Sequence, residues 1–339
     1  MTVQAAEAIP VHKTERRSRA GAWWFLLRRV VQGIIVILIV TLIVFALLHL
    51  AMPDGPAAGV LGLQATQEQI DAFNKENGFD LPLWQQYLHY LGRLVTGDLG
   101  SSFTLNRPVS DLIGQRLPKT LVLAVISMIV ALAVAIPMGV HQATHRGAFS
   151  DYAFTTWNFI VYSTPSFFLG LVLVIVFAQA LPWFPAQAPQ GSTVAEVLAN
   201  PAGLVLPVVT AALAIIATFS RYMRSSTMDN LSEDYVRTAR AKGTPMPVVI
   251  RRHVLRNSLT PVIAMLGYYL PVMFGGMIVV ESLFNYPGMG LLFWTSAQTS
   301  DYPVLLGCVL VIAVATVIGS LLADLIQALL DPRTRGGLS

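Results

Sequence analysis

The chain has 339 residues, of which 55% are hydrophobic and only 12% are charged. Soluble domains carry about 25% charged residues, and the mean hydropathy here is +0.63. This composition excludes most soluble proteins and indicates a membrane protein. The single cysteine, Cys308, excludes an internal disulfide framework. The net charge of +4 is compatible with nucleic-acid binding, but no stacking-aromatic pattern or known motif for it is present.

Six stretches of the chain lack Asp, Glu, Lys and Arg, and each can hold one membrane span. A spanning helix needs about 20 mostly apolar residues. The longest stretch is interrupted in its second half by Pro182, Pro185 and Pro189, so we expect a loop there. The sequence therefore predicts an all-α integral membrane protein with spans over 30–51, 120–141, 158–181, 202–221, 258–280 and 303–328.

The distribution of lysine and arginine predicts the orientation of these spans. If the N-terminus is cytoplasmic, 17 of the 22 basic residues fall in or at the edge of cytoplasmic segments, and the loops 182–201 and 281–302 hold none. Short cytoplasmic loops of membrane proteins are enriched in basic residues. We therefore expect both termini in the cytoplasm, with polar tails at 1–22 and 333–339.

The segment 52–119 lies between the first two spans and is too long for a simple hairpin. It contains a capping box at Thr66 and Gln69, followed by a polar helix that ends at Gly78. Residues 82–95 have the apolar spacing of an amphipathic helix. Pro108 then begins a helix that continues toward the second span. The sequence predicts a helical extracytoplasmic segment here.

The segment 222–257 is expected to be cytoplasmic and to hold two short helices. A helix over about 233–242 would bring the small residues Ala239 and Gly243 onto one face with Val236 and Arg240, where another surface could approach closely. Gly243 is a typical helix stop. A second, interfacial helix is expected over 245–256, and the dipeptide Thr260–Pro261 is expected to begin the fifth span.

Four ordered motifs resemble those of ABC importer permeases, specifically the dipeptide/oligopeptide/nickel subgroup. The run EDYVRTARAKG at 233–243, followed by RHVLRNSLTPV at 252–262, resembles the cytoplasmic coupling loop of that subgroup. The other motifs are GDLGSSF at 97–103, STPSFFLG at 163–170 and ESLFNYPGMG at 281–290. The resemblance covers about 23–332, which would form one transmembrane domain, and matches the first permease type of the subgroup.

This resemblance implies a type I importer permease fold in the bacterial cytoplasmic (inner) membrane. It also implies a second homologous permease, two ABC ATPase subunits and an extracytoplasmic substrate-binding protein as partners, with peptides as cargo. The resemblance would place the contact with the ATPase on Glu233, Asp234, Val236, Arg237, Ala239, Arg240, Ala241 and Gly243. The chain departs from the general loop pattern, because Arg237 and Thr238 occupy the first two positions of the usual Glu-Ala-Ala, while Ala239 matches the third. Any role of an acid at position 237 is therefore lost.

Further residues are candidates for the translocation path and for docking of the binding protein. Glu281 ends the fifth span, where an acid opposes the helix dipole and so needs a partner or a wet cavity. The candidates for the translocation path or outer gate are Pro165, Gly275, Gly276 and Glu281. The helix 82–95 and the turn after it supply the docking candidates Trp84, Tyr87 and Asp98.

Other functional classes fit the sequence less well. No G-x-x-x-x-G-K-[ST] sequence is present, so ATP and magnesium are expected on the partner subunits, with no cofactor, metal or catalytic residue in this chain. His141 and His145 have a metal-binding spacing but no acid or cysteine nearby, which favours two interfacial histidines. A secondary transporter would need ionisable residues at the span centres. The same motifs are compatible with import of a nickel chelate or another small solute.

Overall fold

The computed structural model describes residues 19–51, 56–62 and 65–330, and helix is its dominant structure. The long helices are α1 (Arg19–Ala51), α5 (Val109–Thr144), α6 (Phe149–Ser163), α9 (Val205–Leu231), α12 (Leu255–Leu283) and α14 (Tyr302–Leu330). Between residues 19 and 330, the described backbone has one isolated bridge, Ser101 with Pro108, and no named strand. The all-α prediction is confirmed.

Each predicted span coincides with an apolar helix or with a bent pair of helices. Four continuous segments are long and apolar enough to cross a membrane, and they run Leu27–Leu50, Val109–Thr144, Pro201–Leu231 and Tyr302–Leu325. Two further pairs are bent, and the described residues have six spans if each pair counts as one. The charge-free stretches therefore identified the spans, because lipid accepts only segments that carry few charges.

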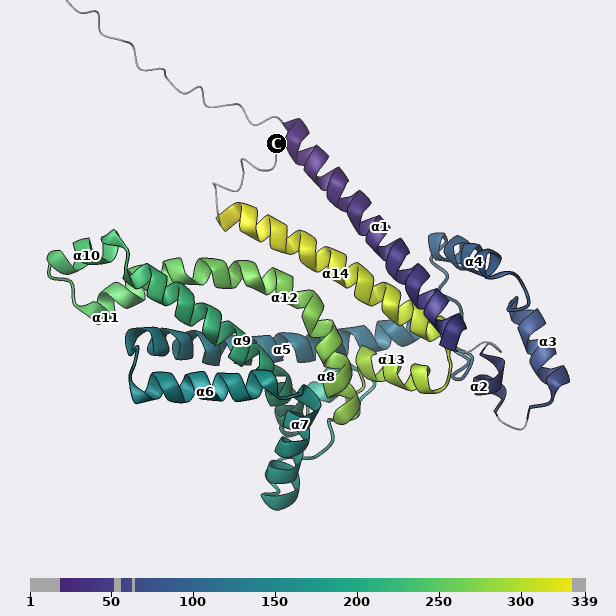
Figure 1. The fold of residues 1–339 in the computed structure, drawn as a ribbon. Helices are drawn as coiled ribbons and strands as arrows, with labels where there is room; N and C mark the ends of the chain where they lie inside the picture. The colour runs from purple at the N-terminus through teal and green to yellow at the C-terminus, as the bar shows by residue number, and fades with distance from the viewer. Residues whose placement is uncertain (1–18, 52–55, 63–64, 331–339) are drawn as a thin grey trace, which may run out of the picture.

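The third span differs from its predicted course. It was expected as one helix over 158–181, but α6 begins at Phe149 and ends at Ser163. After a break it continues as α7 (Ser166–Val174) and the π-helix η1 (Ile175–Ala180), turned by 106° from α6. Proline lacks an N–H group and cannot continue a regular helix. Pro165 therefore lies at a sharp corner in the middle of the span, where α7 turns away from α6 (Figure 1).

The fifth span also differs, because no separate interfacial helix precedes it. The short helix α11 (Met246–Val249) passes through the π-helix η3 (Ile250–Val254) directly into α12. Thr260 and Pro261 lie inside α12 and do not begin it. The span is bent by 63° between Tyr269 and Val272. The predicted boundary was wrong because a proline can lie inside a membrane helix when neighbouring helices and local π-helical turns satisfy the backbone groups that it leaves free.

The core lies around α9, which packs against α5, α6, α7 and α12. Of the most apolar 18-residue stretch in each span, 72% is buried in the span that contains α9, against 17% in α1. Gly139 of α5 allows a close contact with α9, since a Cβ atom there would lie 2.7 Å from the Ser220 carbonyl oxygen. At the margin, α1 runs beside α14 (Figure 1). The bundle is therefore centred on α5 and α9.

Shorter helices lie at the two ends of the bundle (Figure 1). One end, here called the α10 end, carries α11 and α10 (Asp234–Ala241). The other, here called the α4 end, carries α2 (Ala57–Leu61), α3 (Gln67–Asn77), α4 (Leu83–Val95) and α13 (Met289–Gln298). The loop before α9 holds α8 (Val194–Leu198) and the 3-10 helix η2 (Pro201–Leu204). The predicted capping box of α3 is confirmed, while α13 was not predicted.

The packing of α5 on α9 gives a direct test. We expect Gly139→Ala to lower the stability of the solubilised protein by about 1–3 kcal/mol, because the added methyl group meets backbone atoms that cannot move aside. Gly114→Ala, in the same helix, is the matched control, since its Cβ would meet nothing within 4 Å. Cys308 is fully buried, so its reaction with a thiol-reactive dye during heating reports unfolding. Equal midpoints for the two variants would contradict the packing.

Candidate functional site

The residues of the predicted coupling loop form a compact unit at the α10 end. Asp234 lies in the first turn of α10, where a carboxylate is favourable for the helix dipole. The helix stops as predicted at Gly243, whose φ is 81°. In this left-handed conformation a side chain adds strain. A Cβ at Gly243 would meet nothing within 4 Å, so the chain itself leaves this corner open.

The inner face of α10 packs against its own chain. Val236 is 2% exposed and lies in a small apolar cluster with Val249 and Val254. Tyr235 and Ala239 pack against the same cluster. The face that carries Val236 and Ala239 was expected to meet a partner, and the structure corrects this: Val236 is enclosed, and Ala239 is half-buried. Their contribution is to hold α10 onto α11 and η3.

The outer face of α10 is free of contacts with the bundle. The exposed members of the predicted set are Glu233, Asp234, Arg237, Arg240, Ala241 and Gly243. Asp234 and Arg237 are joined by an exposed ion pair of 3.3 Å, which contributes little to stability because water screens it. Ala241 is the smallest side chain on this face. Close approach by another protein is therefore possible at Ala241 and Gly243 rather than at Ala239.

Two polar contacts join the spans to one another beside this unit. The hydroxyl groups of Ser226 in α9 and Ser258 in α12 each donate to the other residue's carbonyl oxygen, at 3.1 and 3.3 Å. Nearby, Arg224 forms a bidentate pair with Asp151 of α6, with both N–O distances 2.9 Å. The Asp151 side chain is nearly enclosed, at 5% exposure. The last turns of α9 are thus fastened to both α6 and α12.

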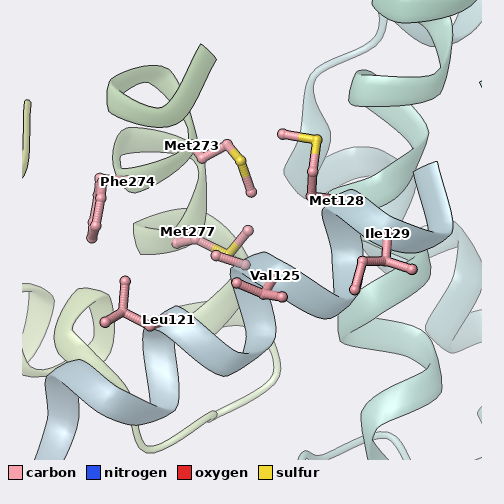
Figure 2. A pocket seen from close by; sticks show the side chains of 8 residues that line it. Leu121, Val125, Met128, Ile129, Met273, Phe274 and Met277 are labelled. Atoms are coloured by element: carbon pink, nitrogen blue, oxygen red, sulfur yellow. The ribbon is translucent and has the colours of Figure 1, made fainter. Parts of the chain in front are cut away.

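A pocket of about 160 Å³ lies between α5 and α12 (Figure 2). Its wall is apolar and rich in methionine, a flexible side chain that adapts to different neighbours. The lining residues are Leu121, Ala124, Val125, Met128, Ile129, Met273, Phe274 and Met277. The path candidates Gly275 and Gly276 are exposed beside it, and Cβ atoms there would meet nothing within 4 Å. These two glycines therefore lie on an open apolar surface of this chain.

Glu281 has a different environment from the one expected of a path residue. Its side chain is fully buried and accepts hydrogen bonds from Thr120 Oγ1 at 2.6 Å and from the backbone N–H groups of Gly290 and Leu291. It thus caps the N-terminus of α13, where a carboxylate is favoured. Gly288 is needed beside it, since a Cβ there would overlap the carboxylate. The predicted partner exists, but Glu281 does not face an open passage within the described residues.

Of the three docking candidates at the α4 end, two are exposed and one is half-buried. Trp84 is 63% exposed, and Asp98 is exposed and accepts the N–H of Gly100 at 2.8 Å. Tyr87, by contrast, is half-buried against α1, and its hydroxyl donates to the Leu38 carbonyl oxygen at 3.0 Å. Tyr87 therefore joins α4 to the first span and is less accessible than Trp84 and Asp98.

Sequence reasoning missed two buried acids. Asp301, between α13 and α14, is fully buried and accepts hydrogen bonds from the Ser102 hydroxyl and from the backbone and hydroxyl groups of Thr104. This bonding holds the GDLGSSF motif against the bundle. Asp151 is the second. Both acids border charge-free stretches in the sequence, but nothing in the local pattern identifies partners that are 73 and about 200 positions away.

The two histidines at 141 and 145 stack with their ring centroids 4.3 Å apart. His141 Nε2 lies 3.1 Å from Ser150 Oγ, and His145 Nδ1 lies 3.1 Å from the His141 carbonyl oxygen. Among the residues that the structure describes, no three His, Cys, Asp or Glu side chains gather as a metal site. Asp324, a charge within the last span, pairs with Arg29 of α1 at 2.6 Å.

The comparisons with known proteins agree with this architecture. Residues 131–336 match the family described as binding-protein-dependent transport system inner membrane component, and residues 23–124 match the N-terminal region of such membrane components. An oligopeptide transport system permease protein of Bacillus subtilis is 38% identical over 311 residues, covering 91% of this chain and 98% of that protein. A putative peptide permease protein of Brucella ovis is 36% identical over 318 residues, covering 92% and 98%.

A glutathione transport system permease protein of Escherichia coli is 34% identical over 311 residues, covering 92% of this chain and 98% of that protein. The match thus extends over almost the whole chain in several relatives, and it includes both ends of the helical bundle. The chain belongs to the family of inner membrane components of binding-protein-dependent transport systems, the permeases of ABC importers.

Proposed function

We propose that this chain is one of two permease subunits of an ATP-driven importer of peptides. Its partners would be a second homologous permease, two ATPase subunits and an extracytoplasmic binding protein that delivers the cargo. The family match and the names of the relatives support this assignment. The chain has no P-loop sequence of its own, so hydrolysis of ATP belongs to the partners and this subunit is not an enzyme.

The observation that carries the proposal is the outward face of α10. The helix is short and packs through Val236 against α11 and η3. It ends at Gly243, where an added side chain would meet no other part of the chain within 4 Å. A partner that pulls on this face moves α9 and α12 together, because the Ser226–Ser258 contact joins them. Movement of the ATPase subunits would therefore reach two spans of the bundle.

The second permease would cover the apolar side of α5 and α12. An exposed pocket with no polar lining, beside Gly275 and Gly276, suits either lipid or another membrane helix. A six-span chain needs such a partner to enclose a passage. We place the path at this junction, where methionine side chains would tolerate cargo of different shapes.

Reconstitution of the full transporter tests the cargo class. We expect a binding protein loaded with a di- or oligopeptide to stimulate ATP hydrolysis, because delivery of cargo selects the state that closes the ATPase subunits. The same binding protein without peptide is the control. Stimulation by a nickel chelate and not by any peptide would contradict peptides as the cargo while leaving the importer assignment intact.

The coupling face is tested by adding bulk to it. Gly243→Leu and Ala241→Trp should each reduce uptake by about tenfold or more, since overpacking costs ~1–3 kcal/mol and 1.4 kcal/mol corresponds to tenfold in binding. Gly243→Ala shares the backbone strain of the leucine variant but not its bulk, and should retain uptake.

The measurements are peptide uptake and the amount of ATPase subunit that co-purifies with each variant. The amount of permease in the membrane should stay normal. A larger side chain at Gly243, or on the exposed side of Ala241, would not collide with the rest of the permease. Normal uptake by both bulky variants would show that α10 does not contact the ATPase.

The orientation is tested by labelling single cysteines in a Cys308→Ser background. Cysteines at Ala148, exposed just before α6, and at Ser232, exposed just after α9, should react with a reagent supplied from the cytoplasm. A cysteine at Asn77, exposed at the end of α3, should react with an impermeant reagent from outside. The reason is the concentration of basic residues at the α10 end. Reaction at Ser232 from outside would reverse the topology.

A further inference from the structure

Helix α4 has more apolar surface than its own chain covers. Its inner face packs Tyr87, Tyr90, Leu91 and Leu94 against α1 and α14. A second row along the same helix stays uncovered, and we call it the α4 strip: Trp84, Leu88 and Val95, which are 63%, 54% and 89% exposed. The strip carries no charged or hydrogen-bonding group except the indole N–H of Trp84.

The contacts of α4 place it beside the first span, below the end of that span. The Tyr87 hydroxyl reaches the Leu38 carbonyl oxygen at 3.0 Å and lies 3.1 Å from Thr41 Oγ1. The neighbouring Gln86 Oε1 lies 2.9 Å from Nε2 of His49, one residue before Leu50, where the apolar segment ends. The Tyr87 ring also lies 5.4 Å from the ring of Phe45. Helix α4 therefore runs at a depth that the apolar part of α1 occupies.

The surface of α1 next to these contacts is itself uncovered. Only 17% of its most apolar window is buried, and the exposed side chains near its end include Leu42, Ile43 and Leu47. A membrane span with so little protein cover faces acyl chains. The α4 strip adjoins this surface, because it follows directly around the helix from the face that packs on α1.

The opposite side of α4 has the composition of a headgroup- and water-facing surface. His89 and Arg93 are exposed there, together with the half-buried Gln85. A helix with an apolar side and a polar, basic side lies in the membrane interface with its apolar side among the acyl chains. Tryptophan is enriched at that depth.

We infer that α4 is an interfacial helix inserted in the leaflet at its end of the molecule, and that the α4 strip contacts lipid. This inference rests on the membrane location of α1 and not on the cargo or the ATPase contact. It removes Trp84 from the surface offered to a binding protein. It leaves α3 and the polar side of α4 for that contact, and it fixes the height of the 65–100 segment relative to the bilayer.

The test uses the assembled transporter in phosphatidylcholine liposomes, with single cysteines in a Cys308→Ser background carrying an environment-sensitive fluorophore. Trp84→Cys and Leu88→Cys probe the strip, and His89→Cys, the neighbour of Leu88 on the polar side, is the matched control. We expect doxyl-labelled lipid to quench the two strip positions several-fold more than the control, and aqueous iodide to quench the control several-fold more.

Two results would overturn the inference. If iodide quenches the fluorophores in the strip, and a binding protein then protects them from iodide, the strip is a protein-docking surface. Strip positions that neither quencher reaches, and that cross-link to the second permease, would make it a subunit interface. A fluorophore at Asn77 in α3 should respond to iodide in all three cases, which confirms that the labelled segment is folded and accessible.

Discussion

The structure depends on one constraint: lipid offers no hydrogen-bond partners to the backbone, so backbone N–H and C=O groups at that depth must find their partners within the protein. Helices meet this requirement over most of each span. At the corner between α6 and α7 the requirement is met differently. Pro165 has no N–H group to satisfy, and the Thr164 hydroxyl returns to the Ile160 carbonyl oxygen at 2.7 Å. A turn of 106° is therefore possible inside an apolar segment.

The same constraint explains where the buried charges lie. Asp151 is bound by Arg224, Glu281 by Thr120 and the first N–H groups of α13, and Asp301 by the GDLGSSF loop. Each acid joins parts of the chain that are distant in sequence. Since an unpaired buried charge is costly, these contacts hold the two ends of the bundle in fixed positions. The outward face of α10 and the polar side of α4 lie at the two ends of the bundle that these contacts join.

Much of this could be predicted from residue types alone. Charge-free stretches identify spans because charge is excluded from lipid, and the caps at Thr66 and Gly78 mark the ends of α3 because they act locally. The errors concern tertiary packing. Val236 and Ala239 share a face with Gly243 by spacing, but which face turns inward depends on Val249 and Val254 from the next segment. Glu281 was expected to need a partner, yet α13, which supplies it, has no strong signal of its own.

The most direct measurement of the central claim is site-specific photo-cross-linking from α10 in the assembled transporter. A benzoyl-phenylalanine at Ala241 or Arg237, both exposed, should cross-link to the ATPase subunit. The same group in place of Tyr235, which packs against the Val236 cluster, should cross-link only within the permease. Cross-linking to the ATPase from Tyr235, with none from Ala241 or Arg237, would contradict the account of how this chain is coupled to ATP hydrolysis.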